Sequence, residues 1–161
     1  MSSFSNLRFS VAVLSLSLCS LTALAQSTAP ALKAYLGVKD ALVATNGVNA
    51  KRGATALLSA LNRVDAAKLS APDRKALAMA KTHALAISKT TDVDDQREQF
   101  GMLSTSMIAL TKATKPAKSY VQFCPMAAGG QGASWLSDKK EVRNPYYGDK
   151  MLKCGSVKEE I

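Results

Sequence analysis

The feature that most constrains the fold is a nearly continuous helical pattern between residues 29 and 114. Ala, Leu and Lys dominate this region, and its apolar residues recur at three- and four-residue spacing, which is typical of amphipathic helices. Short polar segments break the pattern three times. We therefore expect four helices, beginning near Pro30, after Asn49, at Ser70 and at Thr91. Because the connections are short, neighbouring helices should run antiparallel as an up-down four-helix bundle.

The ends of these helices carry recognisable signals. Pro30 suits a first helical turn, and Asn46-Gly47 is expected to stop the first helix. Ser70 is expected to cap the third helix through its side chain. Lys115-Pro116 should end the fourth helix, since proline cannot continue it.

After Pro116 the character of the sequence changes. Residues 120–123 predict a short extended segment, and a glycine-rich loop follows. Trp135, Tyr146 and Tyr147 are expected to anchor this tail on the helices, because large aromatic side chains dominate the energetics of packing. The fold class predicted is mainly α, with a bundle over residues 26–115. An irregular or short-β tail over residues 116–161 should pack on it within the same domain.

The first 25 residues predict a secretory signal peptide. Arg8 precedes an apolar run from about residue 9 to residue 24, and Ala23-Leu24-Ala25 fits a small-x-small cleavage site. Cleavage after Ala25 would make the protein periplasmic, with no stable membrane insertion afterwards. It would also remove Cys19, leaving Cys124 and Cys154 as the two cysteines of the mature chain.

Composition argues against several classes of function. The net charge of +9 could suit nucleic acid, but an exported protein rarely meets it and few aromatic residues are available to stack on bases. We therefore expect a solvated basic surface and no nucleic-acid partner. The sequence lacks the common hydrolase, phosphate-loop and dinucleotide signatures, and His83 is its single histidine. A non-enzyme is expected; a thiol enzyme that pairs a cysteine with His83 is the catalytic alternative.

The cysteine and methionine side chains are the remaining candidates for a chemical role. Cys124 and Met126 share one side of an extended segment, and Met151 and Cys154 share one turn if that stretch is helical. Thiolate and thioether ligands favour Cu(I). The third helix presents His83 on its apolar stripe, as a core histidine or as a further ligand. These five residues are the candidate metal site.

A disulfide is the competing fate of the two cysteines. Exported proteins live in an oxidising compartment, and the mature chain holds one even pair, Cys124 and Cys154. Closing such a loop stabilises a domain by roughly 3–4 kcal/mol. Spacing and compartment favour the bridge, whereas the flanking methionines favour the metal.

Four stretches of the chain resemble an exported bacterial family of unknown function, whose members occur alone or attached to periplasmic adaptor subunits of heavy-metal efflux pumps. The resemblance spans Tyr35 to Val157 and is carried by QREQFGMLSTSMIAL, YVQFCPMA, ASWLS and VRNPYYGDKMLKCGSV, with the motifs C-P-M-A, W-L, N-P-Y-[YF]-G and M-L-x-C-G in order. It implies a helical bundle with a cysteine-bearing tail and a link to copper. The C-P-M element falls on Cys124 and Met126, the M-L-x-C element on Met151 and Cys154, and the helical histidine on His83.

Two functions follow as expectations. The first is a periplasmic protein that binds a soft metal, Cu(I) above all, and takes part in metal handling or efflux. The second is a non-catalytic interaction module, stabilised by a Cys124–Cys154 disulfide. Its expected partner is a periplasmic efflux adaptor or another metal-handling protein.

Overall fold

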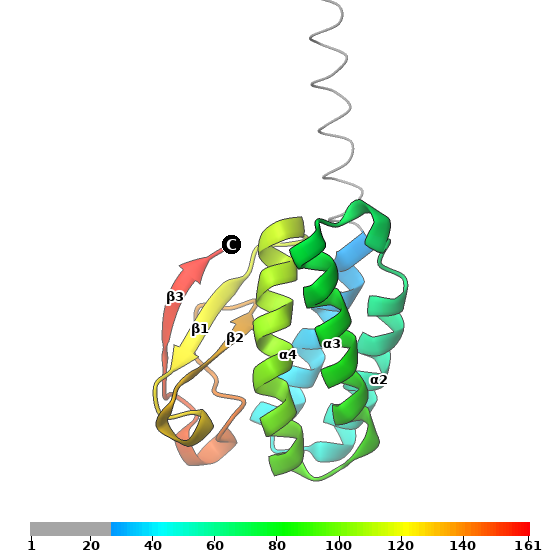
Figure 1. The fold of residues 1–161 in the computed structure, drawn as a ribbon. Coiled ribbons are helices and arrows are strands. Elements are labelled where there is room, and N and C mark those ends of the chain that lie inside the picture. Colours follow the sequence, from blue (N-terminus) through cyan, green and yellow to red (C-terminus); the bar gives the residue numbers. More distant parts are fainter. Residues whose placement is uncertain (1–26) are drawn as a thin grey trace, which may run out of the picture.

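The computed structural model describes residues 27–161, so the predicted signal peptide lies outside the described residues. Four helices are followed by a small sheet (Figure 1). This arrangement confirms the predicted mainly α fold with a short-β tail. The helices span residues 27–43 (the first helix), Gly47–Asn62 (α2), Ala71–Lys89 (α3) and Val93–Thr114 (α4).

The junction between the first helix and α2 corrects one prediction. Thr45 adopts a left-handed conformation with φ of 53°, and the Asn46 amide donates to the Ala41 carbonyl at 2.9 Å, as in a Schellman motif. Asn46 then caps α2, because its side chain accepts from the Asn49 amide. The Asn46-Gly47 pair therefore starts α2 at Gly47, earlier than predicted, and Thr45 ends the first helix.

The ends of α3 and α4 follow the sequence signals. The Ser70 side chain accepts from the Asp73 amide at the start of α3. Asp92 accepts from two backbone amides at the start of α4, where a carboxylate also suits the positive helix end. Lys115 is left-handed and closes α4 just before Pro116. Such local signals fix helix ends without help from the rest of the fold.

The tail forms a three-stranded antiparallel sheet of order β2-β1-β3. Its strands are Tyr120–Cys124 (β1), Ala133–Ser137 (β2) and Ser156–Glu160 (β3). The sequence predicted β1 alone. The edge strand β3 is exposed along its whole length, and ion pairs join Glu159 to Lys112 and Glu160 to Lys118. Because β3 is charged and exposed, it lacks the alternating apolar pattern from which a strand is predicted.

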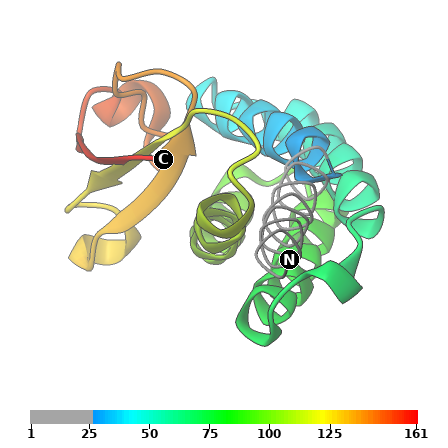
Figure 2. The same ribbon diagram turned by 90° about the horizontal axis from the view of Figure 1, so that it is seen from above.

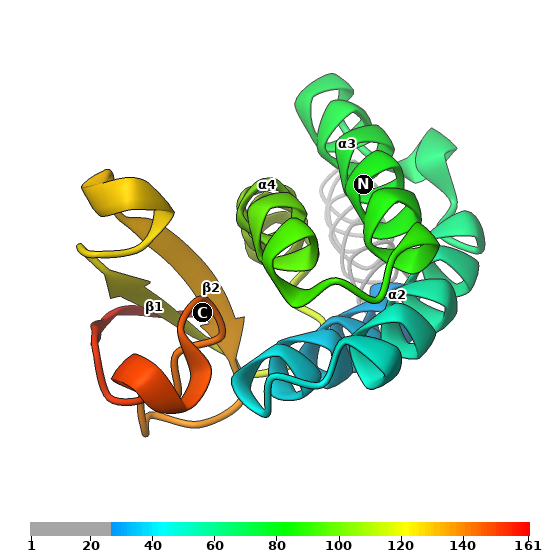
Figure 3. The same cartoon turned by 90° about the horizontal axis from the view of Figure 1, so that it is seen from below.

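Helix α4 lies between the sheet and α3, as the views from above and from below both show (Figures 2 and 3). An aromatic cluster crosses this junction, with ring centroids 5.3 Å apart for Tyr35 and Phe100, 5.8 Å for Phe100 and Tyr146, and 5.9 Å for Trp135 and Tyr146. Trp135 and Tyr146 are buried, and both anchor the tail.

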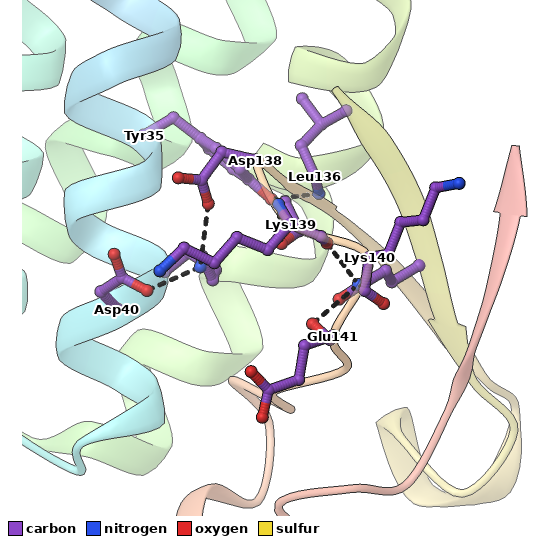
Figure 4. Close-up of polar contacts among 10 residues, drawn as sticks. Tyr35, Asp40, Leu136, Asp138, Lys139, Lys140 and Glu141 are labelled. Carbon is purple, nitrogen blue, oxygen red and sulfur yellow. Dashed lines mark hydrogen bonds and ion pairs between the residues drawn. The ribbon is translucent and has the colours of Figure 1, made fainter. Parts of the chain in front are cut away.

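Polar contacts also hold the tail to the first helix (Figure 4). The Tyr35 hydroxyl accepts from the Leu136 amide at 3.1 Å and lies 2.7 Å from the Ser104 hydroxyl. Within the tail, the amide nitrogen of the buried Gln122 side chain lies 2.9, 3.2 and 3.1 Å from the backbone carbonyl oxygens of residues 139–141, which share its two N–H groups. Within residues 27–161, every helix is too short or too polar to cross a bilayer.

Candidate binding groove beside the disulfide

Cys124 and Cys154 form a disulfide, with their Cα atoms 5.7 Å apart. This confirms the pairing expected from the sequence. Cys124 ends β1, and Cys154 lies two residues before β3. The bridge therefore joins the ends of two neighbouring strands, at the point where the chain leaves or re-enters the sheet.

The bridge stands at the base of two loops. The first tail loop, residues 125–132, leaves β1 after Cys124; the second tail loop, residues 144–153, returns to the sheet through Cys154. A further contact joins the two loops, since the Tyr147 hydroxyl donates to the Met126 carbonyl. The two loops are thus cross-linked both at their base and along their length.

Asn144 closes the second tail loop on itself. Its backbone amide donates to the Leu152 carbonyl at 2.8 Å, and its side-chain amide donates to the Cys154 carbonyl at 3.0 Å. Its side-chain oxygen accepts from the Tyr146 amide. Asn144 is fully buried, so these bonds satisfy groups that would be costly to leave unpaired.

Arg97 connects the second tail loop to the helices, a role that sequence reasoning missed. From α4, its Nε donates to the Pro145 carbonyl at 3.0 Å, and its Nη2 donates to the Leu42 carbonyl and the Thr45 hydroxyl at 3.2 and 3.1 Å. Its Nη1 lies 3.4 Å from the Asp94 carboxylate. All three guanidinium nitrogens therefore take part in contacts within the fold. A planar group with five donors suits such a junction.

A groove of about 290 Å³ lies between α4 and the two tail loops. We call it the tail groove, and most of its lining is apolar. A more polar depression of about 430 Å³ adjoins it and shares Arg97 and Tyr147. The tail groove is lined by Arg97, Glu98 and Gly101 of α4, by Ala128 and Gly129 of the first tail loop, and by Tyr146 and Tyr147 of the second.

Gly101 forms the α4 side of the groove, and packing does not require a glycine there. A Cβ at this position would have Tyr146 Cε1 as its nearest neighbour, at 3.9 Å, which is an ordinary contact. Glycine within a helix costs roughly 0.5–1 kcal/mol relative to alanine. Glycine at position 101 therefore leaves the groove open, although alanine would fit there and would make α4 more stable.

The tyrosine hydroxyls of this region are engaged in structure. Tyr146 donates to the Ser134 carbonyl at 2.8 Å, and Tyr147 to the Met126 carbonyl. Burial raises the pKa of Tyr146 above its usual range. Burial likewise raises the pKa of Tyr35, and the nearby Tyr146 adds to this shift. The groove is therefore suited to hold an apolar group rather than to transfer a proton.

Of the five residues proposed as metal ligands, Cys124 and Cys154 form the disulfide. Met126 and Met151 lie two and three residues from these cysteines along the chain. Met126 lies on the first tail loop with 52% of its surface exposed. Met151 ends the short helical turn Gly148–Met151 (η3), and its carbonyl accepts from the Cys154 amide. Both cysteine sulfurs are bonded to each other.

His83 lies elsewhere. It belongs to α3, which α4 separates from the sheet (Figure 3), and its Nδ1 lies 2.9 Å from Gln99 Oε1 of α4. Residues 27–161 contain no group of three or more His, Cys, Asp or Glu side chains placed to hold a metal ion. The structure therefore places His83 apart from the other four proposed ligands, with its Nδ1 within hydrogen-bond distance of Gln99.

Comparison with family models identifies the family of the chain. A family model described as "Protein of unknown function (DUF3347)" matches residues 31–119, which is more than half of the chain. This range covers the first helix from residue 31 onward and all of α2, α3 and α4, and it ends just before β1. The chain matches no curated protein and no solved structure.

Proposed function

Because the chain belongs to the DUF3347 family, described as having unknown function, we propose a function from the tail groove: the protein is a non-catalytic interaction module. The groove receives an apolar side chain of a partner protein. The Cys124–Cys154 disulfide holds the two tail loops in the geometry that forms the groove. The protein acts after export, where such a bridge persists.

The open space above Gly101 is the observation that carries this proposal. Alanine would fit at this position without a clash and would stabilise the helix, yet glycine keeps the groove accessible. Next to it, the Tyr146 and Tyr147 rings supply aromatic walls. Aromatic residues around a cleft with few polar groups are typical of sites that bind apolar groups.

The partner we propose is a periplasmic efflux adaptor or another metal-handling protein. The resemblance of the tail motifs to proteins attached to efflux adaptors supports this choice. The groove is small, so it would hold one anchoring side chain while the surrounding surface forms the rest of the contact.

The test compares two glycine-to-leucine variants. Gly101→Leu fills the groove, whereas Gly37→Leu places the same side chain on an exposed position of the first helix with nothing within 4 Å of its Cβ. Calorimetric titration with a purified efflux adaptor should show binding to the wild type and to Gly37→Leu, and much weaker binding to Gly101→Leu. Equal binding of both variants would refute the groove as the docking site.

We propose soft-metal binding as a second candidate, confined to the reduced protein. Met126 and Met151 lie on the two loops that the disulfide joins, so opening the bridge would free two thiols beside two thioethers. That set of donors suits Cu(I). It supports a role as a copper chaperone, buffer or sensor in efflux.

Copper binding has its own test. The reduced protein is titrated with Cu(I), and the complex is analysed by native mass spectrometry. The cysteine site is expected to hold one copper per chain, so Cys124→Ser/Cys154→Ser should bind one copper fewer than the reduced wild type. Unchanged copper binding in this double variant would rule out the cysteine site while leaving the groove proposal untouched.

A further inference from the structure

The imidazole of His83 has one nitrogen that its surroundings leave unused. Gln99 Oε1 lies 2.9 Å from Nδ1, and an amide oxygen can only accept, so Nδ1 carries the proton. In the neutral ring, Nε2 then holds a lone pair. Nε2 is buried, and within residues 27–161 it has no hydrogen-bond partner. Buried polar atoms are rarely left unpaired, so this one calls for an explanation.

Two methionines lie one helical turn from the His83–Gln99 contact, one on α3 and one on α4. Met79 precedes His83 by one turn of α3, and Met102 follows Gln99 by one turn of α4. The two helices are antiparallel neighbours, and the His83–Gln99 contact sets their register. Both methionines therefore lie on the same side of that contact, one turn beyond it.

Both methionines are unusually accessible for large apolar side chains. Met79 has 38% of its surface exposed and Met102 has 54%. Neither serves as a main element of the core, in contrast to Met107, which is buried two turns away from Gln99 on the same helix. Their thioethers are therefore free to turn toward a ligand at the seam between α3 and α4.

We propose that His83 Nε2, Met79 and Met102 form a site for a soft monovalent metal ion, Cu(I) or Ag(I). Imidazole and thioether are donors that suit such ions and bind harder cations poorly. Gln99 acts as a positioning residue, because its bond to Nδ1 fixes the tautomer that leaves Nε2 free, as outer partners of metal-binding histidines commonly do. This site goes beyond the groove and the cysteine pair and requires neither.

The test uses Ag(I), which is not a reductant and leaves the disulfide intact. Native mass spectrometry of the oxidised full chain should show one Ag(I) bound. Because His83 is the single histidine, long-range ¹⁵N–¹H spectra report its Nε2 without ambiguity, and this resonance should shift as Ag(I) binds. No bound ion, or a bound ion without an Nε2 shift, would overturn the proposal.

Matched variants identify the ligands. Met79→Leu/Met102→Leu should lose the bound ion, whereas Met126→Leu/Met151→Leu removes two methionines elsewhere and should retain it. Gln99→Leu should weaken affinity by about 10- to 100-fold. Leucine preserves the volume of methionine, so melting curves should show that all three variants fold. Retention in the first pair, or loss in the second, would place the ion elsewhere.

Discussion

Reducing the Cys124–Cys154 disulfide should lower the free energy of unfolding by about 3.6 kcal/mol. The bridge closes a segment with a sequence separation of 30. For a loop of that size, the chain-entropy model gives roughly 12 cal/mol/K of lost freedom in the unfolded state, which yields this value at 25 °C. A typical domain has only about 5–15 kcal/mol in total, so the reduced protein should remain folded but be much less stable.

The expected shift in melting temperature follows from the size of the domain. Unfolding residues 27–161 should have an entropy of about 0.28 kcal/mol/K near the midpoint. Dividing the loss in stability by this entropy predicts a fall of roughly 13 °C. Differential scanning calorimetry with and without a phosphine reductant measures it directly.

The control is the double variant Cys124→Ala/Cys154→Ala. Alanine is chosen because Cys124 is fully buried, where a serine hydroxyl would add a desolvation cost of its own. The melting temperature of the variant should be close to that of the reduced wild type and should not change when the reductant is added. A wild-type shift below about 4 °C, or an equal response in the variant, would refute the reasoning.

Three other substitutions or conditions test the contacts around the groove. Arg97→Lys should destabilise the protein by about 2–3 kcal/mol in urea titrations, because one ammonium cannot reach the Pro145 and Leu42 carbonyls together. Arg63 lies on the exposed surface, so the control Arg63→Lys should be near neutral. Gly148→Ala should lower the free energy of unfolding by more than the roughly 1–2 kcal/mol of left-handed strain, because its Cβ would lie 2.5 Å from the Thr45 hydroxyl. Gly129 also has a positive φ but has open space around its Cβ position. Gly129→Ala should therefore cost the strain alone. Burial raises the folded-state pKa values of Tyr35 and Tyr146, so their contribution to the free energy of unfolding is complete below about pH 10. Above that pH the free energy of unfolding should fall by about 2.7 kcal/mol per pH unit for the pair. Tyr35→Phe should halve that slope, and an unchanged slope would contradict the assignment.

Sequence signals predicted most helix ends because those ends depend on residues close in the chain. Ser70 and Asp92 cap the helices they precede. Asn46-Gly47 was misassigned because the same dipeptide suits a helix stop and a helix start. Distant contacts decide between them: the Gln96 side chain donates to the Gly47 carbonyl at 2.9 Å, and a Cβ at Gly47 would lie within 2 Å of the Thr91 carbonyl oxygen.

The site was less predictable, because long-range contacts form it. The cysteine pair was expected from compartment and number, and the disulfide confirms the pairing. The bonds of Arg97 join residues 48 to 55 positions apart, and no local pattern marks such an arginine. His83 was expected on an apolar stripe of the third helix, but nothing in the sequence placed α4 between α3 and the sheet (Figure 2).

The second tail loop is held at its two ends by different means, and this determines what reduction can do. Arg97 fixes the Pro145 end to α4 through a hydrogen bond, and the disulfide fixes the Cys154 end to β1. Reduction removes the covalent part of the second attachment and leaves the Arg97 bond in place. The tail groove should therefore loosen on the side of its loops while its α4 wall stays fixed, which would make partner binding depend on redox state without unfolding the bundle.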